Sequence, residues 1–200
     1  MQTLQDLKNA VEGTRDLSSI ARAMKALAAV RIRQSQKAVR SLRSYADAVE
    51  KGFQILLKRE PRRAGTLTEP SEGRTVSVVM GSDLGMVGGF NRQVADFLAQ
   101  EGEDPSREVL VAVGLRVVAE LERTGRRVEE RFPMPDTVEA MPERIQDLVV
   151  ALDTLRQEHA PDRVVVVYQH YRSGSDFEPR MDQLLPLDPD WVQALSPKTW

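Results

Sequence analysis

The first 60 residues carry one continuous helical pattern. Apolar residues recur at alternating spacings of three and four from Leu4 to Leu56, and twelve of these sixteen positions are apolar while none holds an acid. A sustained spacing of about 3.5 residues is typical of a coiled-coil helix. No proline occurs before Pro61 to interrupt the helix. A helix of this length would extend about 80 Å and cannot bury its apolar stripe against itself.

This apolar stripe is uneven along its length. Large side chains occupy both ends, whereas the middle carries small or polar residues such as Ser18, Lys25 and Ser35. Small residues allow a partner helix to approach closely, or a surface to slide rather than lock. The pattern therefore predicts a partner along residues 4–56, either from this chain or from another.

Residues 74–188 show a different pattern, in which short apolar runs alternate with amphipathic segments. Strands are predicted at 75–80, 108–114, 126–132 and 163–172, with a further extended segment at 178–187. Helices are predicted at 91–102, 115–125 and 142–159. Strands that alternate with helices of about ten or more residues indicate an α/β fold, with a mostly parallel, Rossmann-like sheet and flanking helices.

A change of composition separates the two patterns. The segment PRRAGTLTEPSEG (61–73) is rich in Pro, Gly and Thr and predicts a linker. We therefore expect a coiled-coil helix at 1–60, a linker at 61–73, an α/β domain at 74–188 and the start of a further connection at 189–200. Charge divides in the same way: residues 1–60 carry a net charge of +6, and residues 61–200 carry a net charge of -8.

The positive charge of the helix is concentrated in its middle. Between Asp16 and Asp47 there are seven cations and no acid. A solvated helix face is the ordinary explanation, and contact with an anionic partner is the alternative. Nucleic acid fits poorly, because no aromatic side chain precedes Tyr45 to stack on a base and the second unit is acidic. An acidic protein surface is the better candidate.

The stretch MGSDLGMVGGFNRQ (80–93) places four glycines between a predicted strand and a predicted helix. This layout can hold a phosphate, and a small α/β nucleotide-binding protein with a coiled-coil extension is an alternative function. The lysine and hydroxyl of a phosphate loop are missing after Gly89, and Asp83 would repel a phosphate. The other two interpretations are a protein-contact loop and a tight turn with positive φ at Gly85, Gly88 and Gly89, in which Ser82 or Asn91 serves as a cap.

Composition excludes several kinds of site. The chain has no cysteine and two histidines, His159 and His170, so disulfides, thiolate metal sites and histidine-rich metal sites are ruled out. We expect structural roles for both histidines, no cofactor and no metal. The N-terminus has no signal or transit pattern and no apolar run is long enough to span a membrane, so we expect a soluble, intracellular protein that could dock on a membrane complex.

Three motifs together resemble one known family. The segments SSIARAMKALAAVRIRQSQ (18–36), SDLGMVGGFN (82–91) and QLLPL (183–187) are similar, in order and spacing, to conserved motifs of the gamma subunit of rotary F-type ATP synthases. The resemblance implies a rotating central stalk that couples the rotation of a proton- or sodium-translocating c-ring to ATP synthesis or hydrolysis in the beta subunits. Such a subunit has no catalytic residue of its own.

The resemblance also implies partners and a location. The expected partners are the alpha and beta subunits of the head, the epsilon subunit and the c-ring, with no nucleic acid. The expected location is the cytoplasmic face of a bacterial plasma membrane, as a peripheral subunit. In the family, the residues that match Met24 and Lys25 lie opposite an acidic loop of the beta subunits, and the glycine loop lies near the same region. The predicted partner-contact residues are therefore Met24, Lys25, Arg31, Arg33, Asp83 and Val87.

The sequence departs from the family in three respects. Leu84 replaces an arginine and Val87 replaces a cysteine in the glycine loop. Family members also continue into a second long helix that pairs with the first, and this chain stops before that region. We therefore expect the stripe at 4–56 to lack an intramolecular partner, so that the isolated chain self-associates through its N-terminal helix, frays there or packs the helix on its α/β domain.

Overall fold

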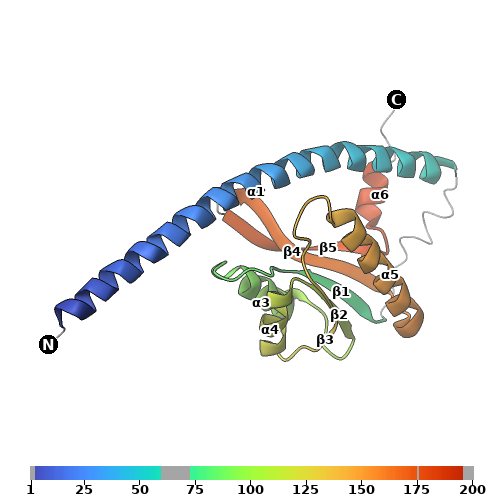
Figure 1. Ribbon diagram of the computed structural model, residues 1–200. Coiled ribbons are helices and arrows are strands. Elements are labelled where there is room, and N and C mark those ends of the chain that lie inside the picture. The colour runs from blue at the N-terminus through green and yellow to red at the C-terminus, as the bar shows by residue number, and fades with distance from the viewer. Residues whose placement is uncertain (1–2, 60–72, 175, 196–200) are drawn as a thin grey trace. The chain divides into compact units, whose positions relative to one another are not determined.

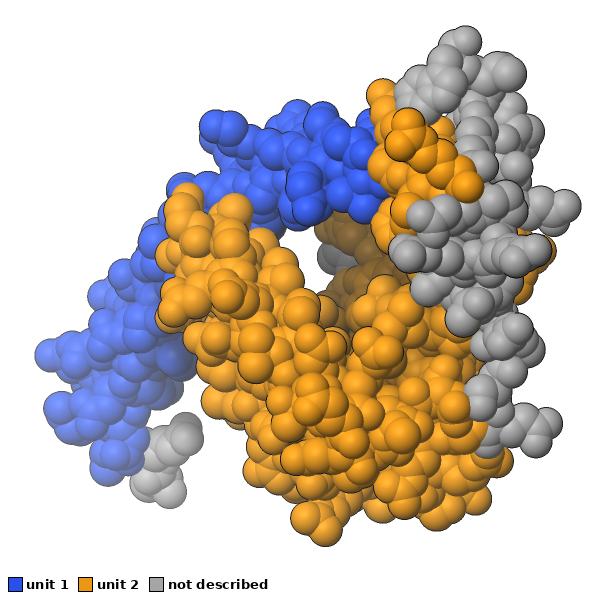
Figure 2. All heavy atoms as spheres, turned by 90° about the vertical axis from the view of Figure 1, so that its right-hand side faces the viewer, with its two compact units in different colours: residues 1–49 blue, residues 50–200 orange. Residues whose placement is uncertain are grey.

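The computed structural model describes residues 3–59, 73–174 and 176–195. The chain divides into two compact units, residues 1–49 and residues 50–200, which Figure 2 colours separately. Most of the predicted linker, residues 61–72, and the end of the chain, 196–200, lie outside the described residues. These two units divide within the predicted helix, between residues 49 and 50, and the predicted domain boundary at residue 60 stays a prediction.

Helix α1 (Leu4–Arg59) is continuous over 56 residues, which confirms the predicted long N-terminal helix. A reciprocal capping box starts it, in which the Asp6 amide donates to Thr3 Oγ1 at 3.2 Å and the Thr3 amide donates to Asp6 Oδ2 at 3.1 Å. The helix ends two residues before Pro61, as the restricted backbone ahead of a proline requires. Among the helices of the described residues, none is long and apolar enough to cross a membrane.

Residues 73–185 hold a five-stranded sheet in the order β3-β2-β1-β4-β5 (Figure 1). Its strands are β1 (Thr75–Met80), β2 (Glu108–Val113), β3 (Val128–Phe132), β4 (Arg163–Ser173) and β5 (Asp176–Leu185). The first four are parallel and β5 pairs antiparallel with β4. The structure therefore confirms the α/β class with a mostly parallel sheet.

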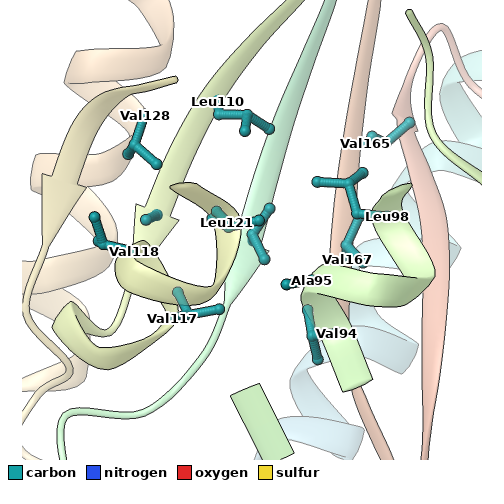
Figure 3. Close-up of a cluster of buried hydrophobic side chains, with 12 residues drawn as sticks. Val94, Ala95, Leu98, Leu110, Val117, Val118, Leu121, Val128, Val165 and Val167 are labelled. Carbon is teal, nitrogen blue, oxygen red and sulfur yellow. The ribbon is translucent and has the colours of Figure 1, made fainter. Parts of the chain in front are cut away.

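Helices cover both faces of the sheet, as continuous β-branched strands require. Helices α3 (Phe90–Glu101) and α4 (Leu115–Arg123) cover one face, where Val94, Leu98 and Leu121 pack with side chains from all the parallel strands (Figure 3). Helix α5 (Met141–His159) covers the other face through Leu155, with Leu148 and Leu152 partly buried beside it. Successive residues of these strands, such as Leu110 and Val111 of β2, therefore face two different cores.

Two features of this unit differ from the expectation. Strand β3 begins at Val128 rather than at residue 126, because Arg126 turns inward to a buried ion pair. A short helix that was not predicted, α6 (Pro189–Leu195), follows the sheet, and its Trp191 ring meets the Phe53 ring edge-on at 5.7 Å. The aromatic contact shows that the last turns of α1 belong with the packing of residues 50–200.

Candidate functional site

Within residues 1–49, α1 presents its apolar stripe to solvent. Its large apolar side chains are all at least about one third exposed, and Leu4 is the most exposed of them at 87%. The two ends of the stripe, with Leu4 and Leu7 at one and Val39 and Leu42 at the other, are as exposed as the middle. An amphipathic helix that leaves this much apolar surface in water is built for contact with a partner.

The seven cations between Asp16 and Asp47 lie on the same exposed helix. Within the part of the chain that the structure describes, none of the seven forms an ion pair; Arg22 and Arg40 only bond back to the carbonyls of Ser18 and Gln36, at 3.4 and 3.3 Å. The predicted contact residues Met24, Lys25, Arg31 and Arg33 are all exposed here. Met24 and Arg31 are seven residues apart and share one helix face, whereas Arg33 points to another side. The arrangement offers unneutralised positive charge around the whole middle of the helix.

The glycine loop after β1 is held by hydrogen bonds between its Ser82 and Asn91 of α3. Asn91 Oδ1 accepts from the Ser82 amide at 2.9 Å, and Asn91 Nδ2 donates to Ser82 Oγ at 3.0 Å. Asn91 is buried at the first turn of α3. The two predicted cap residues therefore bond to each other and close the loop, while the N-cap position itself is Gly89 without a side-chain bond.

Asp83 ties this loop to two other chain segments. Its carboxylate accepts from the Leu115 amide at 2.5 Å, at the first residue of α4, and from the Met134 amide at 2.8 Å, after β3. An N-terminal helical amide is a favourable partner for a carboxylate. Its carboxylate is engaged within the chain, where it fixes the position of the loop, and the predicted contact of Asp83 with a partner stays a prediction.

The tip of the loop is apolar and exposed. Leu84 is 63% exposed and Met86 is 89% exposed, while the predicted contact residue Val87 is half-buried. Met86 also has a φ of 57°, which is a strained conformation for a residue with a side chain. Gly88 has a positive φ as predicted, but Gly85 and Gly89 do not, so the second left-handed position falls on Met86.

Another glycine that the sequence pattern did not single out is essential for the same loop. Gly114 has a φ of 104°, and a Cβ there would lie 2.7 Å from the backbone of Gly81 and Ser82. Gly114 therefore lets the turn after β2 pass against the glycine loop. Its signal in the sequence was a glycine placed between a strand and a helix, which is also common in ordinary turns.

The carboxyl ends of β1 and β4 form the switch point where ligands bind in many open α/β sheets. Here Gln169 Nε2 donates to the Phe90 carbonyl at 2.9 Å, and the rings of Phe90 and Phe177 pack edge-on at 5.2 Å. The β4–β5 hairpin thus fills this crevice. A phosphate at the nearby start of α4 would have to displace the carboxylate of Asp83, and this geometry disfavours the nucleotide-binding alternative.

Several other polar groups of the unit bond within the chain. Among the described residues no group of three or more His, Asp or Glu side chains could hold a metal ion. His159 ends α5 and accepts a bond from Arg74 at 3.3 Å, and the ring of His170 packs on Tyr168. Arg126 and Glu108 form an ion pair whose side chains are only 4% and 1% exposed.

This buried ion pair is completed by hydrogen bonds to three other segments. Arg126 Nη2 donates to the Leu98 carbonyl at 3.0 Å and the Glu103 carbonyl at 3.2 Å, and Ser77 Oγ donates to Glu108 at 2.6 Å. Burial raises the pKa of Glu108, against the lowering effect of Ser77 and Arg126. Sequence reasoning missed the pair because an RR dipeptide (Arg126) and a charged residue at the start of a strand (Glu108) both ordinarily indicate a solvated surface.

Comparisons with known proteins agree on one family. A model of the ATP synthase family matches residues 3–199. The ATP synthase gamma chain of Cyanothece sp. is 24% identical over 97% of this chain and 64% of its own length, and that of Herminiimonas arsenicoxydans is 26% identical over 97% and 69%. The chain thus spans about two thirds of the length of these relatives.

Solved structures with a similar arrangement come from central stalks. The central stalk and c-ring structure of the Tetrahymena thermophila mitochondrial ATP synthase is 16% identical with a TM-score of 0.48, and covers 69% of this chain and 72% of its own. The rotor of the Euglena gracilis mitochondrial ATP synthase is 17% identical with a TM-score of 0.46, and covers 80% and 65%. Because the family model matches nearly the whole length of this chain, the chain belongs to the ATP synthase gamma family.

Proposed function

We propose that this chain is a rotating central-stalk subunit of an ATP synthase, which couples the rotation of a c-ring to ATP synthesis or hydrolysis in the beta subunits. The observation that carries the proposal is helix α1, which is 56 residues long and presents an exposed apolar stripe. Its seven cations between Asp16 and Asp47 form no ion pairs among the described residues. A stiff, charged shaft joined to a compact α/β unit transmits torque and needs no catalytic residue.

The cations of α1 act by loose contact. Lys25, Arg31 and Arg33 are exposed, so their attraction to acidic side chains of beta subunits is screened by salt and water. Contacts of this kind attract the shaft without locking it, and they can break and reform as it turns. Met24, on the face of Arg31, adds a flexible apolar contact that adapts to different surfaces.

The glycine loop supplies a second contact surface. Its exposed tip, Leu84 and Met86, touches the partner together with the half-buried Val87. Asp83 acts by positioning, because its carboxylate holds the loop against Leu115 and Met134. Since Leu84 stands where the family has an arginine, this contact is apolar rather than ionic.

Residues 74–188 would contact the epsilon subunit and the c-ring, whether the ring carries protons or sodium ions. The subunit would then be peripheral, at the cytoplasmic face of a bacterial membrane. If the chain is isolated, its stripe can pair with another copy. Two copies aligned along α1 would bring their cationic stretches together, so we expect this self-association to strengthen as salt rises.

Assembly with alpha and beta subunits tests the proposal. The full chain is mixed with alpha and beta subunits of the same organism, and complex formation and ATP hydrolysis are measured. We expect co-migration and stimulated hydrolysis, with affinity reduced about tenfold or more when Lys25, Arg31 and Arg33 are all changed to Glu. The matched control changes Lys8, Arg15 and Lys51 of the same helix to Glu, and retains binding. Absence of any complex, or equal losses in both variants, would sink the proposal.

A further inference from the structure

The parallel strands share an unexpected feature at their amino ends. An arginine lies directly before β1 (Arg74), before β2 (Arg107) and before β3 (Arg127), and β4 begins with Arg163. In the strand order β3-β2-β1-β4, these four residues form a row across the amino ends of the strands, at one end of the sheet. Neighbouring strands are about 4.8 Å apart, so the row places cations at nearly the closest spacing that a sheet permits.

A cavity of about 350 Å³ opens at this end of the sheet. Three members of the row line it, together with the last residue of α5, and the lining includes Arg74, Arg107, Arg127, His159, Ser106 and Glu129. All three arginines are exposed and His159 is half-buried. The cavity therefore combines a concave shape with donors from four separate segments of the chain, as binding sites for small ligands do.

Three of the carboxylates near this end of the sheet are already engaged. Glu103 pairs with Arg163 at 3.1 Å, Glu108 is buried against Arg126, and Asp104 accepts from the Ser106 amide and hydroxyl, both at 2.8 Å. Glu129 lies 3.9 Å from Arg127, in an exposed pair of the kind that contributes little. Asp162 lies against Gly73 and Glu158 precedes His159, so these two carboxylates add negative charge beside the row.

Two members of the row have neutral partners only, among the residues that the structure describes. Arg74 donates to His159 Nδ1 at 3.3 Å, and Arg107 donates to the Gly73 carbonyl at 3.3 Å. Each guanidinium has five N–H donors, so most of them stay available. Because arginine cannot accept a hydrogen bond, His159 Nδ1 must be the acceptor, which leaves a proton on Nε2 as a further donor. The partial negative charge at the end of α5 opposes an anion, and Arg74 and His159 are placed at that end to offset it.

We propose that this cavity binds a phosphate group, held by Arg74 and Arg107 with Arg127 and His159 at its rim. Planar guanidinium groups match the geometry of phosphate and bind it through paired hydrogen bonds. The group could belong to a free phosphate compound or to a lipid headgroup. The site is at the opposite end of the sheet from the glycine loop, and it does not depend on the proposed rotary function.

Calorimetry on the full chain tests the site, with inorganic phosphate and pyrophosphate as probes. We expect saturable binding of pyrophosphate that weakens about tenfold or more in Arg107→Met and in Arg74→Met. Arg107→Lys should recover only part of the loss, because lysine lacks the planar fork. Arg116→Met is the matched control and should bind normally. It removes an exposed arginine of α4, beyond the carboxyl end of β2 and therefore at the opposite end of the sheet.

Flotation with vesicles separates the two sources of phosphate. Vesicles of phosphatidylcholine are compared with vesicles that also contain phosphatidylglycerol or phosphatidic acid. Binding only to the anionic vesicles, with the same loss in Arg107→Met, assigns the site to a lipid headgroup. Binding of neither probe, binding that is indifferent to Arg74 and Arg107, or binding of an acidic polyglutamate peptide alone would overturn the proposal. Because these side chains are exposed, near-ultraviolet circular dichroism should show the variants to be folded.

Discussion

The two units of this chain use apolar residues in opposite ways. The α/β unit buries most of the valines and leucines of its parallel strands in two cores, one on each face of the sheet. Helix α1 leaves comparable leucines and isoleucines in water over residues 4–49. The α/β unit is therefore stabilised by its own packing, whereas the helix depends on a partner for most of its stability, as helices generally do. The contrast separates residues that maintain the fold from residues that make contacts.

The buried ion pair gives the largest expected effect. Arg126→Met leaves Glu108 buried without its cation, and Glu108→Gln leaves Arg126 buried without its anion. We expect each to lower the free energy of unfolding of the α/β unit by about 3–5 kcal/mol, measured by urea denaturation. The double variant should lose less than the sum of the two. An effect near zero for either single variant would show that the pair is not buried in solution.

A matched pair of leucines tests the contrast itself. Leu98 is fully buried on the sheet-facing side of α3, and Leu27 is 65% exposed on α1. Leu98→Ala should cost about 2–5 kcal/mol of stability because it leaves a cavity, while Leu27→Ala should stay within about 0.5 kcal/mol. Both are read from the same urea denaturation. If the two substitutions cost the same, α1 is packed as tightly as the sheet and the comparison fails.

The anchor of the glycine loop should have an intermediate effect. Asp83→Ala removes the acceptor for the amides of Leu115 and Met134, and we expect a loss of about 1–2 kcal/mol. In the assembled complex, its effect on binding should be rescued by Asp83→Asn, which keeps an acceptor oxygen. If Asp83 touches the partner through its charge, Asn will not rescue it.

The smallest effect expected is a pH dependence. Burial raises the pKa of Glu108, so the folded chain holds this proton more tightly than the unfolded chain does. Its contribution to stability is therefore full below the ordinary carboxyl pKa and is lost as the pH rises through the raised folded-state value. Denaturation across mildly acidic pH should show this decline in the parent chain and not in Glu108→Gln. A parallel decline in both would assign the effect to other groups.

The sequence predicted the regular elements because their signals are local. The β-branched runs of β1, β2 and β4 and the 3.5-residue period of α1 were each recognisable without knowledge of the rest of the fold. The antiparallel direction of β5, the inward turn of Arg126 and the roles of Asp83 and Gly114 were not, because each depends on segments distant in sequence that meet only after folding. The arginine row follows from strand order, which no local pattern specifies.

Hydrogen–deuterium exchange of the full chain, with and without alpha and beta subunits, tests the central claim most directly. In the free chain, amides of α1 over residues 4–49 should exchange fast while those of β1, β2 and β4 stay protected. Adding the subunits should slow exchange along α1 and at the tip of the glycine loop, and leave the sheet unchanged. Exchange in α1 that is already slow in the free chain, or that does not change on addition of the subunits, would contradict the claim that this helix is a contact surface.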